Sequence, residues 1–341
     1  MTKCNELISK LFEEIVENNS NIENEFVPYN KLEFIYLFFS NSSNFDNIKK
    51  QNDIGKKLET LLDVFETLNA KKILYTVIKG PVNAERAFYE SSNRRFNDLD
   101  ILVPYRQIVD VEEALISLGF VQGYENKDKS IEPFSRASKI FYIHNTHQLA
   151  PFIKKSENGN IKIDVNFRLL STGTDELMVE NFINDRNVYK CLNGCNIYRL
   201  SDEKDLLFNI IHCYKDCVDI YQLYKRKGYQ IKSFVDIYGL LKRNEFNKDI
   251  FNEIIQENGL FENVCYVFTI ISTLFSDIEI TDYIYEYKQS DINKFGYSME
   301  YTWEIPLEKR FNKSYIQQNA NFFENEELQK IISYNKKYII V

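Results

Sequence analysis

Two aspartates one residue apart, Asp98 and Asp100, stand in an otherwise apolar run and constrain the chain more than any other feature. The run is Asp98-Leu99-Asp100-Ile101-Leu102-Val103. Because side chains i and i+2 of a strand point to the same face, both carboxylates should project together from a segment suited to burial. Two like charges this close repel each other unless a cation lies between them. Paired oxygen ligands suit Mg²⁺, which also binds the phosphate oxygens of a substrate, although Asp-x-Asp is common on solvated strand faces too.

A strand, a glycine and a helix are predicted just before the two aspartates. The apolar residues 73–78 predict a strand, Gly80 follows it, and a helix is expected over residues 81–90. Backbone N–H groups at the start of such a helix can bind a phosphate. Lys79 beside the glycine can contact a phosphate, or can point to solvent or into an ion pair. This order of elements is typical of a nucleotidyl-transfer site.

A third aspartate lies further along the chain. Residues 161–167 alternate between apolar and polar side chains, which places Asp164 on the polar face of a half-buried strand. Two-metal phosphoryl transfer needs carboxylates that hold two ions and leave one group near the attacking oxygen. Asp98, Asp100 and Asp164 would form such a set if their two strands are neighbours.

These residues resemble the motifs of the uncharacterised bacterial nucleotidyltransferase family, which belongs to the DNA polymerase β-like superfamily. The similar segments are Lys79-Gly80, Arg94-x-x-x-Asp98-Leu99-Asp100-Ile101-Leu102-Val103, Asp164-Val165-Asn166-Phe167 and His212-Cys213-Tyr214-Lys215. The resemblance covers about residues 60–280. It implies the minimal nucleotidyltransferase fold, an NTP such as ATP as substrate, and two Mg²⁺ ions held by the three aspartates.

The chain departs from the family pattern in three places. Asn166 stands where a histidine is usual, Asp216 replaces the second histidine of the helix motif, and Pro81 follows the glycine where the superfamily has serine. These departures concern the acceptor pocket more than the metal site.

Three further basic residues are candidates for nucleotide binding. Arg94 lies in the loop that enters the aspartate strand, where its guanidinium can stabilise charge on the pyrophosphate leaving group or can simply be solvated. His212 and Lys215 are one helical turn apart and share a helix face. Lys215 can contact phosphate and His212 the nucleotide or acceptor, although a histidine among apolar neighbours is more often a core residue.

The cysteines do not predict a zinc site. Cys191 and Cys195 flank an Asn-Gly turn, where placement across a hairpin explains them, and Cys213 and Cys217 are spaced for packing on a helix. Neither spacing is that of a usual zinc knuckle.

Composition limits the class of partner. The net charge of the 341 residues is −8, so the overall field of the protein repels a polyanion and makes a nucleic-acid acceptor less favourable. A hydrophobic content of 44% with 27% charged residues is typical of a globular protein. No apolar run is long enough for a signal peptide or a membrane span, so we expect a cytoplasmic protein with reduced cysteines and no membrane partner.

The predicted fold class is α+β, a mixed β-sheet nucleotidyltransferase core with an N-terminal helical cap and a C-terminal helical domain. The expected domains are 1–70, 71–200 and 201–341. Strands are expected near 72–78, 98–103, 138–144, 148–153 and 161–168, with a helix near 106–118. Hairpins are expected at Asn158-Gly159 and Asn193-Gly194, and a helix after Ser201 with further helices over 231–280.

The predicted reaction is transfer of an NMP from an NTP to a hydroxyl, or similar nucleophile, of a small-molecule or peptide acceptor, with release of pyrophosphate. Two alternatives remain. One is a toxin that adds nucleotides to tRNA or to a protein, which a clustered basic face would favour. The other is a catalytically silent nucleotide-binding protein, which has no physical need to keep three clustered aspartates.

Overall fold

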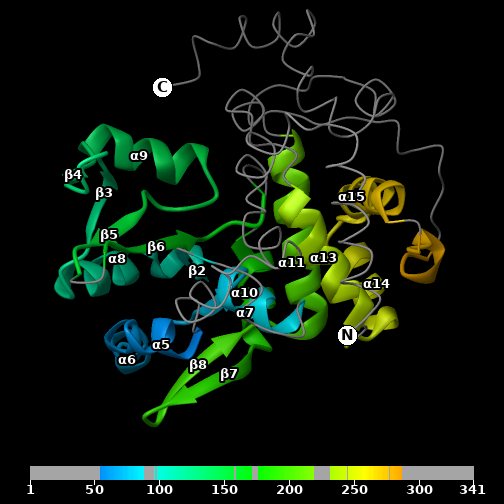
Figure 1. The fold of residues 1–341 in the computed structure, drawn as a ribbon, viewed down its shortest axis with the longest axis horizontal. Coiled ribbons are helices and arrows are strands. Elements are labelled where there is room, and N and C mark those ends of the chain that lie inside the picture. Colours follow the sequence, from blue (N-terminus) through cyan, green and yellow to red (C-terminus); the bar gives the residue numbers. More distant parts are fainter. Residues whose placement is uncertain are drawn as a thin grey trace, which may run out of the picture. The chain divides into compact units, whose positions relative to one another are not determined.

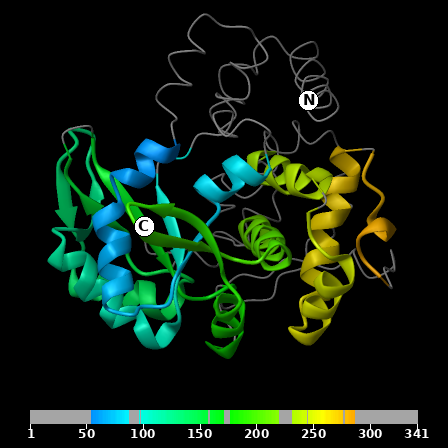
Figure 2. The same cartoon turned by 90° about the horizontal axis from the view of Figure 1, so that it is seen from below.

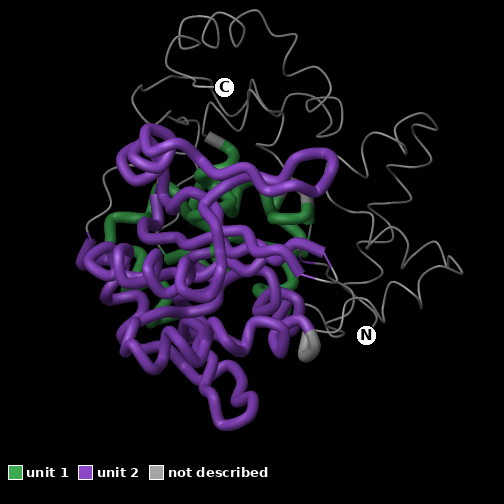
Figure 3. The backbone as a smooth tube through the Cα atoms, turned by 90° about the vertical axis from the view of Figure 1, so that its left-hand side faces the viewer, with its two compact units in different colours: residues 1–41, 209–242, 248–341 green, residues 42–208, 243–247 purple. Residues whose placement is uncertain are grey.

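The computed structural model describes residues 54–87, 96, 98–156, 159–170, 176–218, 231–243, 245–275 and 277–285. The chain forms two compact units (Figure 3). The core unit contains residues 42–208 and 243–247, and the second unit contains residues 1–41, 209–242 and 248–341. Most of the predicted N-terminal helical cap and the part of the predicted C-terminal domain after residue 285 lie outside the described residues.

The core unit is built on one mixed sheet of eight strands with the order β4-β3-β5-β6-β2-β1-β8-β7 (Figure 1). The pairs β1–β8 and β2–β6 are parallel, and the other pairs are antiparallel. The strands are β1 (Thr76–Ile78), β2 (Leu99–Leu102), β3 (Val121–Glu125), β4 (Ile131–Pro133), β5 (Phe152–Lys154), β6 (Ile161–Asn166), β7 (Asn187–Leu192) and β8 (Cys195–Arg199).

Helices surround this sheet and form the described part of the second unit. In the core unit they are α5 (Ile54–Glu59), α6 (Leu62–Ala70), α7 (Gly80–Arg86), α8 (Ile108–Ser117), α9 (Arg136–Asn145) and α10 (Glu176–Asn184). Helix α11 (Asp202–Val218) begins in the core unit and continues into the second unit. The helices that follow are α13 (Ile231–Arg243), α14 (Lys248–Glu257) and α15 (Phe261–Leu274). This arrangement of mixed sheet and helices confirms the α+β class.

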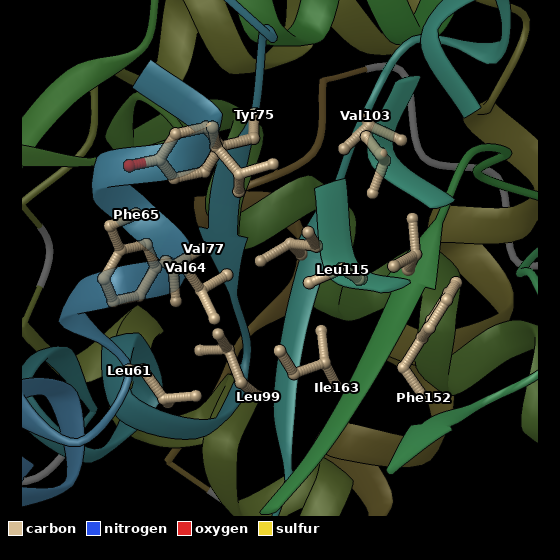
Figure 4. Close-up of a cluster of buried hydrophobic side chains, with 14 of the residues drawn as sticks. Leu61, Val64, Phe65, Tyr75, Val77, Leu99, Val103, Leu115, Phe152 and Ile163 are labelled. Atoms are coloured by element: carbon tan, nitrogen blue, oxygen red, sulfur yellow. The ribbon is translucent and has the colours of Figure 1, made fainter. Parts of the chain in front are cut away.

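One face of the sheet carries the main apolar core. Helix α6 packs against β8 and α8, as two views show (Figures 1 and 2). Val64 and Phe65 of α6 meet Val77, Leu99 and Ile163 from three neighbouring strands in this core (Figure 4). Because side chains alternate along a strand, the residues between these apolar ones face the other side of the sheet.

Both expected hairpins are present. Strands β7 and β8 pair around Asn193 and Gly194, whose φ angles of 50° and 81° are left-handed. Two successive left-handed residues are typical of the two-residue turns that match strand twist, so Asn-Gly suits the position. Strands β5 and β6 pair around Gly159, whose φ angle is 111°.

The expected strand near residues 138–144 is wrong, because this segment is helix α9. The segment is rich in aromatic and branched residues, which favour strands, but the Ser135 hydroxyl caps the helix by accepting a hydrogen bond from the Ser138 N–H. The pattern also missed β3, β4 and α10.

The strand expected over 72–78 is shorter than predicted and covers only Thr76–Ile78. Lys72 has a φ angle of 55° at the end of α6, and the Leu74 N–H donates to the side chain of Gln107 rather than to another strand. No helix among the described residues is long and apolar enough to cross a membrane.

Candidate active site

Two of the three predicted aspartates lie side by side on neighbouring strands. Strands β2 and β6 are parallel, and their register pairs Asp100 directly with Asp164. Asp98 lies just before β2 and is exposed. The neighbouring strands that the three-aspartate set requires are therefore present.

The aspartates project from the face of the sheet opposite the apolar core. Leu99 and Ile101 of β2 are fully or almost fully buried in that core, and so are Ile163 and Val165 of β6. The alternation of strand side chains therefore places Asp100, between its two apolar neighbours, on the other face. The whole of Asp100 is only 7% exposed, so its carboxylate lies in a partly dehydrated setting.

Lys79 reaches this pair from the end of β1. Antiparallel pairing of β1 with β2 sets Ile78 opposite Asp100, which brings the next residue, Lys79, to the same edge of the site. Its ammonium Nζ lies 3.0 Å from Asp100 Oδ1, and both side chains are largely buried. The Lys79 ammonium also lies above the ring of Phe208, 5.9 Å from its centre.

The backbone at Lys79 is strained. Its φ and ψ angles are 52° and −121°, in a region that residues with a side chain rarely adopt. Strain of this kind costs about 1–3 kcal/mol and is retained only where the surrounding structure enforces it. The position joins β1 to α7, so the sharp turn holds the lysine beside the aspartates.

The setting of Asp164 raises the pKa of its carboxyl group to about 7. Burial is the main cause, and the nearby negative charges of Asp100 and Asp98 add to it. The positive charges of Lys79 and Lys162 act in the opposite direction. An added positive charge would therefore stabilise the ionised form of this carboxyl group.

Close packing favours a glycine at position 80, in addition to the predicted role of Gly80 in binding phosphate. A side chain at this position would place its Cβ 3.3 Å from Phe96 Cβ and 3.6 Å from the carbonyl oxygen of Asp98. The glycine therefore lets α7 begin close against the segment that leads into β2. Its contact with phosphate stays a prediction.

Asn166 is a residue of the site whose contacts the sequence did not indicate. Its side chain is fully buried, and its Nδ2 lies 3.5 Å from Asp100 Oδ1 and 3.4 Å from the carbonyl oxygens of Ile101 and Asp164. These are long contacts that orient the amide toward both strands. The alternation over residues 161–167 placed Asn166 on the same face as Asp164. This pattern was the sequence signal that could have identified Asn166 as a residue of the site.

Three further predicted residues lie outside the described part of the core unit. Arg94 lies outside the described residues. His212 and Lys215 lie on the part of α11 that belongs to the second unit. His212 Nε2 is 3.4 Å from Asp216 Oδ2, and Lys215 is buried. The roles of these three residues in nucleotide binding stay predictions.

The donor chemistry of the site fits Mg²⁺, although its ligands are not gathered around one point. Among the described residues, no three His, Cys, Asp or Glu side chains form a group that would hold a metal ion. Asp98, Asp100 and Asp164 supply oxygen donors alone, which suits a hard cation. Since Lys79 contacts Asp100, metal binding at this carboxylate requires side chains to rearrange. No disulfide joins the cysteines 191, 195, 213, 217 and 265 to one another.

Residues 45–276 match the family of uncharacterised nucleotidyltransferases. The match spans more than half of the chain, so the protein belongs to this family. Among solved structures, an antigenic nucleotidyltransferase-like protein from Paracoccidioides brasiliensis is similar at 14% identity, over 65% of this chain and 98% of its own length, with a TM-score of 0.32. The search of curated proteins found no match.

Proposed function

We propose that this protein is a metal-dependent nucleotidyltransferase. It moves an NMP from an NTP to a hydroxyl group, or similar nucleophile, of a small-molecule or peptide acceptor. Family membership supports the class of reaction. The observation that carries the assignment to this site is the direct pairing of Asp100 with Asp164 on adjacent strands, beside a lysine.

In this proposal the three aspartates have different roles. Asp98 and Asp100 would hold one Mg²⁺ ion and Asp164 would help to hold a second, and Asp164 accepts the proton of the acceptor hydroxyl. Bound Mg²⁺ supplies neutralisation of the triphosphate charge and a lower pKa for the acceptor hydroxyl. The acceptor oxygen bonds to the α-phosphorus while the bond from that phosphorus to its bridging oxygen breaks, and pyrophosphate leaves.

In this proposal Lys79 belongs to the same site as the aspartates. Without nucleotide its ammonium neutralises Asp100, at a distance of 3.0 Å. If Asp100 were engaged by a metal ion, the same ammonium would be available to a phosphate oxygen of the NTP. The strained backbone at Lys79 keeps the side chain at the edge of the site in both situations. Gly80 and Arg94 complete the predicted phosphate contacts.

A silent nucleotide-binding protein is the second candidate. It is favoured by the lysine that already compensates Asp100 and by the lack of a ready metal group among the described residues. A protein of this kind would bind nucleotide without transferring any part of it, so a transfer assay separates the two candidates.

The transfer assay uses each α-labelled NTP with Mg²⁺ and a cell extract divided into metabolite, peptide, protein and tRNA fractions. We expect label in the metabolite or peptide fraction, and none with the Asp98→Asn/Asp100→Asn double variant. Label in tRNA or in protein would support the toxin alternative instead. Nucleotide binding without any labelled product would support the silent alternative.

The Asp164→Ala variant tests how the aspartates divide their roles. We expect turnover to fall by several orders of magnitude, whereas the NTP affinity changes less because Asp98 and Asp100 remain. Single-turnover kinetics and equilibrium binding measure the two quantities separately. A large loss of affinity with unchanged turnover would remove Asp164 from the catalytic role.

A further inference from the structure

A cavity lies in the core unit, near the end of strand β1 that is farther from Lys79. Its volume is about 580 Å³, within the range of small-molecule sites. Leu74 lines this cavity before β1 begins, whereas Lys79 follows the end of β1. None of the residues that line the cavity is Lys79 or one of the three aspartates. The cavity is therefore distinct from the candidate active site.

Arg186 is the most informative residue of this cavity. Its guanidinium lies against the ring of Tyr198, with the guanidinium carbon 4.5 Å from the ring centre. Its Nε is buried and has no hydrogen-bond partner among the described residues. Among the residues that the structure describes, no carboxylate forms an ion pair with the Arg186 guanidinium. A planar, always charged donor group held over a ring is suited to binding an oxyanion.

The wall behind Arg186 is held in place by side-chain contacts. The Tyr75 hydroxyl and the Asn69 amide both donate to the carbonyl oxygen of Asn196, at 3.2 and 2.9 Å. The rings of Tyr75 and Tyr198 meet edge to face, with centres 5.9 Å apart. This packing fixes the ring that supports the guanidinium, so little side-chain freedom remains to be lost when a ligand binds.

The charges that line the cavity are two cations and one anion. Lys72 and Glu66 line it together with Arg186, and neither forms an ion pair with another described residue. The lining therefore has an excess of one positive charge in a protein whose net charge is −8. Since the overall field repels anions, a lining with an excess of positive charge points to a specific anionic ligand.

From these observations we propose that the cavity binds a small molecule through a phosphate or carboxylate group, with Arg186 as its anchor. Lys72 adds a second positive charge, and Glu66 opposes the binding. The side-chain amide of Asn196, which also lines the cavity, can contact polar parts of the same ligand. This proposal does not depend on the nucleotidyltransferase activity, because the two sites use different residues.

Binding is measured by titration calorimetry and thermal shift without divalent metal. One arm uses inorganic phosphate, pyrophosphate and AMP, and the other uses glutamate and citrate. We expect one arm to bind wild-type protein, and Arg186→Met to weaken that binding about tenfold or more, since hydrogen bonds to charged groups are among the stronger ones. Arg186→Lys should retain part of the affinity because it keeps the charge and loses the planar fork.

Two further variants test whether binding depends on the charges that line the cavity. Glu66→Gln should strengthen binding of the same anion, because it removes the opposing charge without changing the size of the side chain. Arg106→Met should leave it unchanged, because Arg106 lies outside the cavity and pairs with Glu180. Failure of every anion in both arms would overturn the proposal, and so would equal binding by wild type and Arg186→Met or weaker binding by Glu66→Gln.

Discussion

Asp164 shows how one carboxyl group links the charge of the site to the stability of the protein. Its pKa of about 7 in the folded protein is well above the value of about 3.9 expected in the unfolded chain. Between these values the folded protein holds a proton that the unfolded chain has lost. The free energy of unfolding therefore falls as the pH rises through this window.

The Asp164→Asn variant tests this linkage. We expect a flatter pH dependence of stability than in wild type, and a variant that is more stable than wild type at pH 8 in the absence of metal. Chemical denaturation at pH 5 and pH 8, with a chelator present, measures both proteins. The same pH dependence in the two proteins would show that Asp164 titrates normally.

At the residue scale, the alternation of side chains predicted the strand faces of the aspartates. Strand periodicity alone predicted that Asp98 and Asp100 share a face and that Asp164 lies on a polar face. The contact between Lys79 and Asp100 did not follow from it, because that contact depends on the antiparallel register of β1 with β2. Sequence spacing carries no information about such a register.

At the scale of elements, α7 is fixed by a buried ion network as well as by Gly80. Arg86 at the end of α7 pairs with Asp202 at 2.8 Å and with Asp205, both on α11. Arg199 at the end of β8 pairs with Asp202 as well. Burial raises the pKa of the Asp205 carboxyl, and the charge of Arg86 acts against this rise. The network therefore joins the helix after Gly80 to a strand and to α11.

The Arg86→Met variant should destabilise the protein by about 3–5 kcal/mol, because it leaves a buried carboxylate without its partner. Arg106→Met is the control, since its exposed pair with Glu180 contributes at most about 1 kcal/mol. Urea denaturation at neutral pH measures the free energy of unfolding of both variants. Equal losses in the two variants would mean that the buried network does not hold these elements together.

Local sequence patterns predicted the elements that are bounded by clear turn or capping residues, and they missed several of the others. The Asn-Gly turns and Ser201 marked the hairpins and the start of α11 correctly. In contrast, α9 was predicted as a strand because Ile140, Phe141, Tyr142 and Ile143 favour that state. None of the residues of α9 is fully buried, so the core imposes little periodicity on its sequence.

At the scale of the whole molecule, the sheet explains why residues far apart in the sequence meet. The crossover that sets β6 beside β2 brings Asp164 to Asp100 although 64 positions separate them (164 − 100). The net charge of −8 favours a small or peptide acceptor over a polyanion. The identity of the acceptor depends on a pocket that the sequence motifs do not specify.

The most direct test of the central claim is Mg²⁺-dependent binding of an NTP to wild type and to the Asp98→Asn/Asp100→Asn variant, with circular dichroism as the control for folding. Titration calorimetry is run with and without Mg²⁺. The account predicts binding to wild type that depends on Mg²⁺ and is lost in a variant that remains folded. Wild-type affinity in the folded double variant would contradict the assignment of the site to these aspartates.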